Sequence, residues 1–325
     1  MRNVVFIVFV MGFSCQRNPS YFMTQGEIFK TSAHIKYEYV RALDKEIFAR
    51  LDSFDLSLNP FHPQSVISQV NRNDAVEVDD WFIAVFNKAQ EIAAQTQGAY
   101  DITCAPFINF WGFGYDHLLS DRQQILDSLR AFVGYEKVAL SDRKIIKTDE
   151  RLQLNASSLA KGYAVDVIAE LLESYGITNY MVEIGGEVRT AGNNPAGKAW
   201  GIEILKPIDD STGVVREQQT VIHLHRAAIA TSGNYRNFYI KDGKKYAHTI
   251  HPKTGYPADS NMLSASVICS DCMTADAWAT AFMVVGVEQA VCLAEKIPNM
   301  EYLFIYTDDD GQWQEARSAN FGKTL

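Results

Sequence analysis

"QTVIHLHRAAIATSG", residues 219–233, belongs to a series of stretches that read as successive strands. The others are "AWGIEILKP" (199–207), "YRNFYIK" (235–241), "KKYAHTIHP" (244–252) and "LSASVICS" (263–270). These stretches follow one another without strict alternation with helices. Such an arrangement is typical of an α+β protein that has substantial antiparallel sheet.

Helical patterns occupy much of the remaining chain, at residues 41–58, 81–98, 121–134, 160–176, 274–286 and 286–297. Gly98 and Gly176 end two of these stretches and are natural C-terminal caps. Strand patterns appear at residues 32–40, at 179–192 as a strand pair or bulged strand, and at 301–308 as the final strand. We therefore expect a single compact α+β catalytic domain with a mixed, largely antiparallel sheet and packed helices.

The composition is that of an ordinary globular protein. The chain has 325 residues, of which 47% are hydrophobic and 21% charged, and its formal net charge is -9. An acidic balance argues against a general nucleic-acid-binding protein, which needs a basic face to neutralise phosphates. For a phosphorylated substrate, the positive charge would have to be local or come from a metal. No repeat or linker interrupts residues 25–325, so one domain is the simplest count.

The N-terminus has the proportions of a signal peptide. In "MRNVVFIVFVMGFSC" (1–15), Arg2 precedes an apolar run that is shorter than the ~20 residues a membrane-spanning helix needs. Cys15 follows the small residue Ser14, as at a bacterial lipoprotein cleavage site, although Gly12 and Phe13 make the box imperfect. An ordinary signal peptide or simply a hydrophobic start is the alternative.

We expect residues 1–15 to be a signal peptide with a lipobox that ends at Cys15, residues 16–24 a tether and 25–325 the catalytic domain. The protein would then be an exported inner-membrane lipoprotein that faces the periplasm or the cell-surface side.

Four cysteines remain beyond the N-terminus: Cys104, Cys269, Cys272 and Cys292. Cys269 and Cys272 form a C-x-x-C, but no second pair completes a zinc site. A disulfide between them is conceivable in an exported protein, and buried thiols are favoured.

Asp276 and Thr280 are four residues apart in "TADAWATAF" (274–282), so on a helix they share one face. A carboxylate and a hydroxyl are hard oxygen ligands suited to Mg²⁺, and such a site is often completed by substrate phosphates. The alternative is that Asp276 stabilises the start of the helix.

Two other segments suggest ligand contacts. In "NASSLAKGYAVD" (155–166), Lys161 and backbone N–H groups at a helix start would suit an anion, although an ordinary capping loop fits as well. In "GAYDITCAPFINFWGFG" (98–114), dense aromatic residues suggest a wall for a planar ligand, with Asp101 as a polar group, or else buried packing. Ser232 and Arg236 lie in another turn.

"AHTIHPKTGYPAD" (247–259) carries two histidines three apart. A helical zinc pair has histidines four apart with a glutamate between them, and His248 and His251 would point to opposite faces of a strand. A two-histidine metal site is therefore disfavoured.

Six segments, taken in order, resemble the ApbE family of flavin transferases (FAD:protein FMN transferases) from about Gly26 to Ile305. They are "GAYDIT…WGFG", "LAKGYAVD", "VEIGGEVR", "ATSGNYRNF", "AHTIHPKTGYP" and "ADAWATAF". The resemblance implies that Mg²⁺ helps to split the pyrophosphate of FAD. FMN would pass to a Thr or Ser hydroxyl of a partner protein, and AMP would be released.

The resemblance also implies site residues. The metal positions are Asp276, Thr280 and the backbone carbonyl of Ala160. His248 is the candidate catalytic base because its ordinary pKa is about 6.5, or else it contacts a phosphate, whereas His251 would be a turn residue. The flavin-contacting positions that match are Phe29, Phe61, Ala99, Tyr100, Asp101, Ser157, Tyr163 and Ile250.

Besides His251, which stands where relatives commonly have Asp, the sequence departs from the family pattern at four places. Ala279 stands where some relatives have an acid, Phe61 where many have Tyr, and Phe29-Lys30 replaces Met-Gly. Two other functions remain open: an FAD pyrophosphatase that yields FMN and AMP, and a non-catalytic exported FAD-binding lipoprotein. By analogy the acceptor would be a subunit of a membrane electron-transfer complex.

Overall fold

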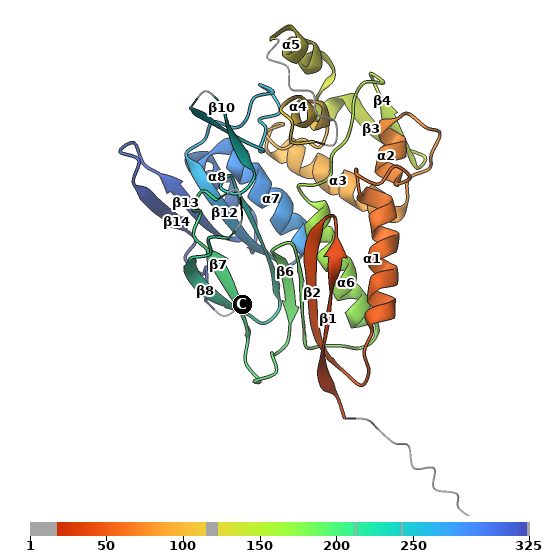
Figure 1. Ribbon diagram of the computed structural model, residues 1–325, viewed down its shortest axis with the longest axis vertical. Helices are drawn as coiled ribbons and strands as arrows, with labels where there is room; N and C mark the ends of the chain where they lie inside the picture. Colours follow the sequence, from red (N-terminus) through yellow and green to blue (C-terminus); the bar gives the residue numbers. More distant parts are fainter. Residues whose placement is uncertain (1–17, 115–122, 211, 213, 242, 324–325) are drawn as a thin grey trace, which may run out of the picture.

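An eight-stranded sheet runs through the molecule in the order β1-β2-β5-β6-β9-β12-β13-β14 (Figure 1). The computed structural model that shows it describes residues 18–114, 123–210, 212, 214–241 and 243–323. The strands are β1 (Ser20–Ile28), β2 (Thr31–Tyr39), β5 (Tyr180–Ile184), β6 (Glu187–Ala191), β9 (Ala227–Gly233), β12 (Met262–Cys269), β13 (Glu301–Thr307) and β14 (Trp313–Arg317). Each neighbouring pair is antiparallel. The predicted α+β class with a largely antiparallel sheet is confirmed.

Smaller sheets and helices surround this sheet. The two-stranded sheets are β3 (Val138–Ser141) with β4 (Lys144–Lys147), β7 (Trp200–Leu205) with β8 (Gln218–Leu224), and β10 (Phe238–Lys241) with β11 (Lys244–Ala247). The helices are α1 (Asp44–Leu58), α2 (Val66–Asn71), α3 (Asp80–Gln95), α4 (Ala105–Phe110), α5 (Gln123–Phe132), α6 (Ala160–Ser174), α7 (Cys272–Val285) and α8 (Val287–Ala294). None of the helices in the described ranges combines the length and hydrophobicity needed to cross a bilayer.

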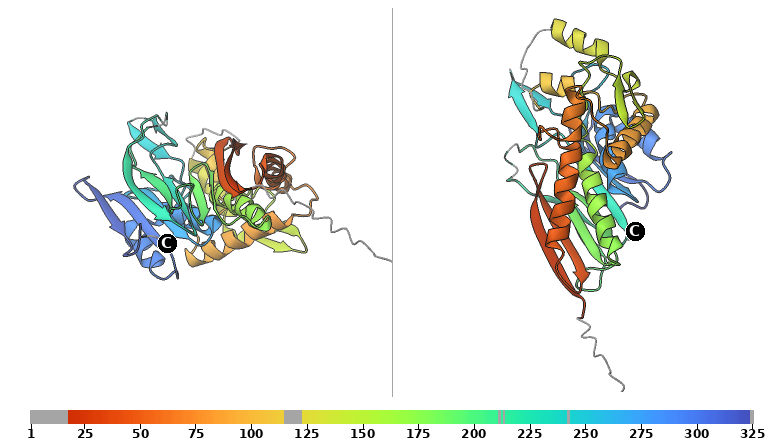
Figure 2. Two further views of the ribbon diagram at one scale, coloured as in Figure 1. Left: turned by 90° about the horizontal axis from the view of Figure 1, so that it is seen from below. Right: turned by 90° about the vertical axis from the view of Figure 1, so that its right-hand side faces the viewer.

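The central sheet is covered on both faces (Figure 2). Helices α6 and α7 pack on one face, with α1 and α3 behind them, and enclose the larger apolar core. The β7–β8 hairpin covers part of the other face through Trp200, Ile202 and Leu224. Strand β12 is therefore buried along nearly its whole length, and its two serines, Ser264 and Ser266, are buried with it.

Several boundaries differ from the sequence prediction. Residues 20–24, expected in a tether, form the first half of β1, which pairs with β2. Residues 219–233 make two strands, β8 and β9, because the chain bends at residues 225–226 and passes from the small sheet to the central one. Residues 301–308 do not hold the final strand, since β14 follows at the edge. The predicted signal peptide lies outside the described residues.

The amino ends of α6 and α7 meet closely, and two carboxylates fix them. Asp271 caps α7 by accepting a hydrogen bond from the Thr274 N–H at 2.8 Å. Asp166 of α6 accepts from the N–H groups of Cys272 and Met273 at 2.9 and 2.8 Å. Negative charge at a helix start satisfies free N–H groups and complements the helix dipole. These contacts fix the first turns of α7, where Asp276 lies.

Candidate active site

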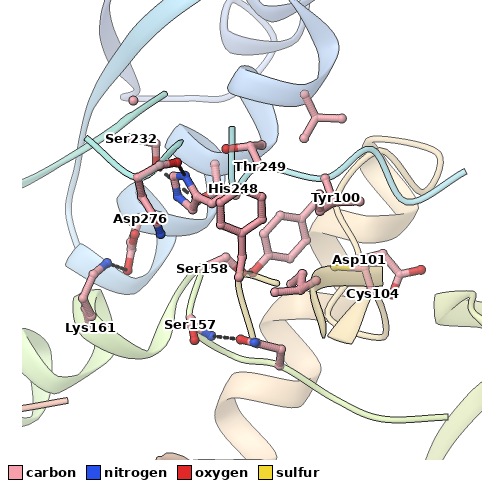
Figure 3. A pocket seen from close by; sticks show the side chains of 18 of the residues that line it. Tyr100, Asp101, Cys104, Ser157, Ser158, Lys161, Ser232, His248, Thr249 and Asp276 are labelled. Atoms are coloured by element: carbon pink, nitrogen blue, oxygen red, sulfur yellow. Dashed lines mark hydrogen bonds and ion pairs between the residues drawn. The ribbon is translucent and has the colours of Figure 1, made fainter. Parts of the chain in front are cut away.

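A cavity of about 480 Å³ lies where the starts of α6 and α7 meet the end of β9 and the loop after β11 (Figure 3). Small-molecule sites typically occupy ~300–1,000 Å³. Residues that are far apart in the sequence form its wall, in segments 99–113, 155–161, 231–237, 248–252 and 276–284. The fold therefore collects in one place most of the segments that the sequence had singled out.

Most of the predicted site residues line this cavity. They are Phe61, Ala99, Tyr100, Asp101, Ser157, His248, Ile250, Asp276 and Thr280. Phe29 and Tyr163 are not among the lining residues. Their rings instead pack edge-on against Phe54, at centroid distances of 5.8 and 5.6 Å. Ala160 is buried at the start of α6 and does not line the cavity either.

Two buried carboxylates and one ammonium group form the acidic end of the cavity. Nζ of Lys161 lies 2.8 Å from Oε1 of Glu187 and 3.6 Å from Oδ2 of Asp276. The same Oδ2 accepts a hydrogen bond from the Gly162 N–H at 3.0 Å. Burial raises the pKa of Asp276, and the charge of Lys161 opposes that shift. Burial likewise raises the pKa of Glu187 to about 7.

Asp276 and Thr280 place a carboxylate and a hydroxyl on one face of α7, as their spacing predicted. In the part of the chain that the structure describes, Oδ1 of Asp276 accepts no hydrogen bond, and Oγ1 of Thr280 lies 3.1 Å from Oγ of Ser232. No three His, Cys, Asp or Glu side chains of the described residues gather as ligands for one ion. One carboxylate and hydroxyl groups suit Mg²⁺, which usually keeps waters and takes further oxygens from substrate phosphates. The residues present fit such an ion.

The ring of His248 faces the cavity in a defined orientation (Figure 3). Its Nδ1 lies 3.2 Å from the backbone carbonyl oxygen of Asn237. Because a carbonyl only accepts, Nδ1 is the donor, and Nε2 of the neutral ring keeps its lone pair. Burial lowers the pKa of His248, and the charge of Lys161 lowers it further. His251 lies instead in a turn, where Gly255 donates to its carbonyl at 2.8 Å.

The opposite end of the cavity is aromatic and apolar. The hydroxyl of Tyr100 lies 2.8 Å from Oγ of Ser158. Asp101 accepts hydrogen bonds from the N–H groups of Thr103 and Tyr135, both at 2.7 Å, so its two oxygens hold the loop together. Its carboxylate therefore has a structural function beside its place on the wall. Phe61 is 45% exposed and lies under the ammonium of Lys30, 4.3 Å from the ring centroid.

Sequence reasoning did not name Glu187, Phe113 or Asn237 as site residues, although each lies in a segment that it had singled out. Glu187 follows two glycines at positive φ that make the tight β5–β6 turn, so a buried acid after Gly-Gly was the available signal. Phe113 packs edge-on against His248, with 6.4 Å between the ring centroids. Asn237 acts through its backbone carbonyl, so its side chain gives no signal in the sequence.

The four cysteines in the described ranges form no disulfide with one another. Cys269 and Cys272 are buried free thiols, and Cys104 and Cys292 are free as well. Burial raises the pKa of Cys269 to about 12. The expected buried thiols are therefore found at the C-x-x-C.

Comparison with known proteins identifies the family to which this chain is similar. The model of the ApbE family matches residues 29–304. The FAD:protein FMN transferase of Vibrio cholerae is 35% identical over 322 residues, which cover 94% of this chain and 93% of the relative. The FAD:protein FMN transferase of Haemophilus influenzae is 35% identical, with 91% and 90% covered.

Solved structures show the same fold. The flavin transferase ApbE from Vibrio cholerae superimposes with a TM-score of 0.84 at 34% identity, covering 94% of this chain and all of that one. The flavinyl transferase ApbE of Pseudomonas stutzeri, in its apo form, gives a TM-score of 0.79 at 27% identity, with 93% and 96% covered. Since both the family model and these relatives span most of its length, this chain belongs to the ApbE family.

Proposed function

We propose that this protein transfers FMN from FAD to a Thr or Ser hydroxyl of a partner protein and releases AMP, with Mg²⁺ bound at Asp276 and Thr280. The supporting observation is that one cavity contains an oxygen ligand pair, a lysine and an oriented neutral histidine. Two relatives of nearly the same length carry the name FAD:protein FMN transferase.

Asp276 and Thr280 would hold the metal through Oδ1 and Oγ1, and the resemblance adds the carbonyl of Ala160. When bound, Mg²⁺ polarises a phosphoryl oxygen and offsets its charge. Lys161 lies beside this position and contributes a second positive charge toward the pyrophosphate.

His248 supplies the base. Its Nε2 would take the proton of the acceptor hydroxyl as that oxygen forms a bond to the phosphorus of the FMN half. The bond from this phosphorus to the bridging oxygen breaks, and AMP leaves with that oxygen. Because its pKa is lowered, His248 remains neutral and able to accept a proton at neutral pH. If water enters in place of the acceptor, the same groups hydrolyse FAD to FMN and AMP.

Flavin labelling of an acceptor tests this function. The protein is incubated with FAD, Mg²⁺ and a purified candidate subunit of a membrane electron-transfer complex, and the denatured products are examined for covalent flavin fluorescence. We expect fluorescence on the acceptor that disappears when its Thr or Ser is changed to Ala. Formation of AMP and free FMN with no labelled acceptor would favour the pyrophosphatase. FAD binding without either product would favour a non-catalytic binding protein.

We also infer that the protein is exported and anchored through a lipid on Cys15. The support is the sequence of residues 1–15 alone. No nucleic acid is expected as a partner, because the net charge of -9 is unfavourable for binding phosphate backbones.

A further inference from the structure

We propose that Glu187 tunes the metal affinity of the site by holding the ammonium of Lys161 away from Asp276. This inference rests on the proposed function, because it requires a divalent cation at Asp276. Lys161 lies between two carboxylates whose side chains are 5% and 2% exposed, Glu187 and Asp276 respectively. It is closer to Glu187, at 2.8 Å, than to Asp276, at 3.6 Å.

The ammonium of Lys161 and a divalent cation compete for the same carboxylate. A Lys161 that moved fully onto Asp276 would neutralise the only carboxylate among the proposed ligands and would repel an incoming cation. Glu187 prevents this by offering Lys161 a nearer partner. Lys161 then stays close enough to face the phosphates while Oδ1 of Asp276 remains available.

Glu187 acts on the metal through Lys161 rather than as a ligand. Its Oε1 is occupied by Lys161, and its Oε2 is buried without a hydrogen-bond partner in the described structure. That Oε2 lies toward the glycine turn, 3.3 Å from where a Cβ on Gly185 would be. The ammonium of Lys161 donates a hydrogen bond to Oε1, and this ion pair offsets the cost of enclosing Oε2 without a partner. Glu187 is therefore a positioning residue.

Two substitutions should change metal binding in opposite directions. Glu187→Gln keeps the size of the side chain but removes its charge, so Lys161 shifts toward Asp276 and the cation binds less tightly. We expect the metal affinity to fall by roughly 10- to 100-fold, the usual effect of removing a group that orients the metal ligands without binding the metal itself. Lys161→Met removes the competing cation, so metal affinity should rise even though transfer activity falls.

The double variant separates a positioning residue from a ligand. In the Lys161→Met background, adding Glu187→Gln should change the metal affinity by less than about 3-fold, because the group through which Glu187 acts is gone. Glu187→Asp, which retains the charge, should recover part of the affinity lost in Glu187→Gln. Glu183→Gln is the matched control, since Glu183 lies on the same hairpin and pairs with His34 outside the cavity.

The experiment is a titration of the full-length protein with Mn²⁺, as a probe for Mg²⁺, by calorimetry with and without FAD. Circular dichroism and thermal melting establish that each variant is folded. The inference is supported by weaker binding in Glu187→Gln, tighter binding in Lys161→Met and little further change in the double variant. An equal loss in both backgrounds, or no loss in either, would overturn it while leaving the proposed function intact. A wild-type protein that binds no Mn²⁺ in either condition would overturn the proposed metal site, and this inference with it.

Discussion

One backbone contact gives His248 the orientation that its proposed role needs. The carbonyl of Asn237 accepts from Nδ1 and leaves Nε2 as the proton acceptor. The sequence indicated that a histidine here was important, but not which ring nitrogen would be the base. A backbone carbonyl 11 residues away has no signature in the sequence.

The pH dependence of transfer should report on this ring. A base works in its neutral form, and burial lowers the pKa of His248, so the neutral form persists to a lower pH than usual. We expect the acidic limb of kcat/KM to have its midpoint below the ordinary value of about 6.5. In His248→Asn, transfer should fall by roughly 10²- to 10⁴-fold and the limb should disappear. The measurement is transfer from about pH 5 to 8.5, with His251→Asn as the control that keeps the limb.

Weakened FAD affinity in His248→Asn with an unchanged pH profile would contradict this role. It would mean that His248 positions a phosphate and that another group is the base.

Lys30 stands in a conformation that favours glycine. Phe29 and Lys30 both have positive φ, 53° and 59°, in the turn between β1 and β2. A left-handed backbone costs a non-glycine residue roughly 1–2 kcal/mol, whereas the cation–π contact of Lys30 with Phe61 returns about 0.5–1 kcal/mol. Lys30→Gly should therefore raise the free energy of unfolding by up to roughly 1.5 kcal/mol.

Denaturant unfolding measures this effect, and Lys30→Ala is its control. The alanine variant loses the contact with Phe61 but keeps the backbone cost, so it should be slightly destabilised. A glycine variant that is no more stable than the alanine variant would mean that the turn is not strained.

At the level of secondary structure, the junction of α6 and α7 carries the site. A Cβ built on Gly162 would lie 2.3 Å from the carbonyl oxygen of Cys272 and 2.8 Å from Cβ of Asp276. Both are atoms that cannot swing away, so the two helices must separate to admit a methyl group. The absence of a side chain at position 162 brings the Gly162 N–H to Asp276.

Gly162→Ala should disturb both stability and the metal site. We expect a loss of roughly 1–3 kcal/mol in the free energy of unfolding, typical of an overpacked core, together with weaker Mn²⁺ binding. Gly201→Ala is the matched control, because its Cβ would meet only ordinary contacts, 3.7 Å from Val221. Thermal unfolding and Mn²⁺ titration measure the two effects. A Gly162→Ala protein as stable as Gly201→Ala would show that the helices adjust freely.

The longer helices were predictable from the sequence, and the edges of the sheet were not. Helices α1 and α3 bury one face each, so apolar residues recur at helical spacing, whereas α6 and α7 are buried on most sides and are apolar over much of their length. Strand β14 is mostly exposed and has no apolar alternation, and β1 has few fully buried positions. These two strands form because they pair with β2 and β13, and such pairing between strands cannot be read from a local pattern of apolar residues.

At the scale of the whole molecule, the site exists only because the fold gathers distant segments. Lys161, Glu187, His248 and Asp276 come from a helix start, a strand, a loop and a second helix. Spacing alone identified the Asp276 and Thr280 pair on one helix. The order of the motifs, through the family resemblance, indicated His248. The placement of Glu187 beside Lys161 depends on how β6 pairs in the sheet, and neither the residue spacing nor the order of the motifs shows that pairing.

The position of β1 restricts how the protein would sit at a membrane. Five residue steps lead from Cys15 to Ser20, the first residue of β1, a reach of at most about 18 Å. Figure 1 shows the start of β1 at one end of the longest axis and β10 in the half of the molecule that lies toward the other end. An anchor at Cys15 would therefore hold the β10 end away from the bilayer.

Cys15→Ser tests the anchor, because lipidation requires the thiol. We expect the variant to leave the membrane fraction or to remain as an unprocessed precursor, whereas Cys292→Ser, at an exposed thiol, should behave as wild type. Fractionation with mass spectrometry of the mature N-terminus measures this. Cleavage at another position with no acyl chain would rule the anchor out.

The central claim is that Asp276 enables a metal-dependent transfer in which each FMN attached to the acceptor yields one AMP. Asp276→Asn tests it best, because an amide oxygen keeps the hydrogen bond from Gly162 while the negative charge is lost. AMP release and covalent flavin on the acceptor are measured together, with Mg²⁺ and with a chelator. The account predicts equal amounts of the two products for the wild type with Mg²⁺, and neither product with the chelator or in Asp276→Asn. Undiminished transfer by the folded Asp276→Asn variant would contradict it.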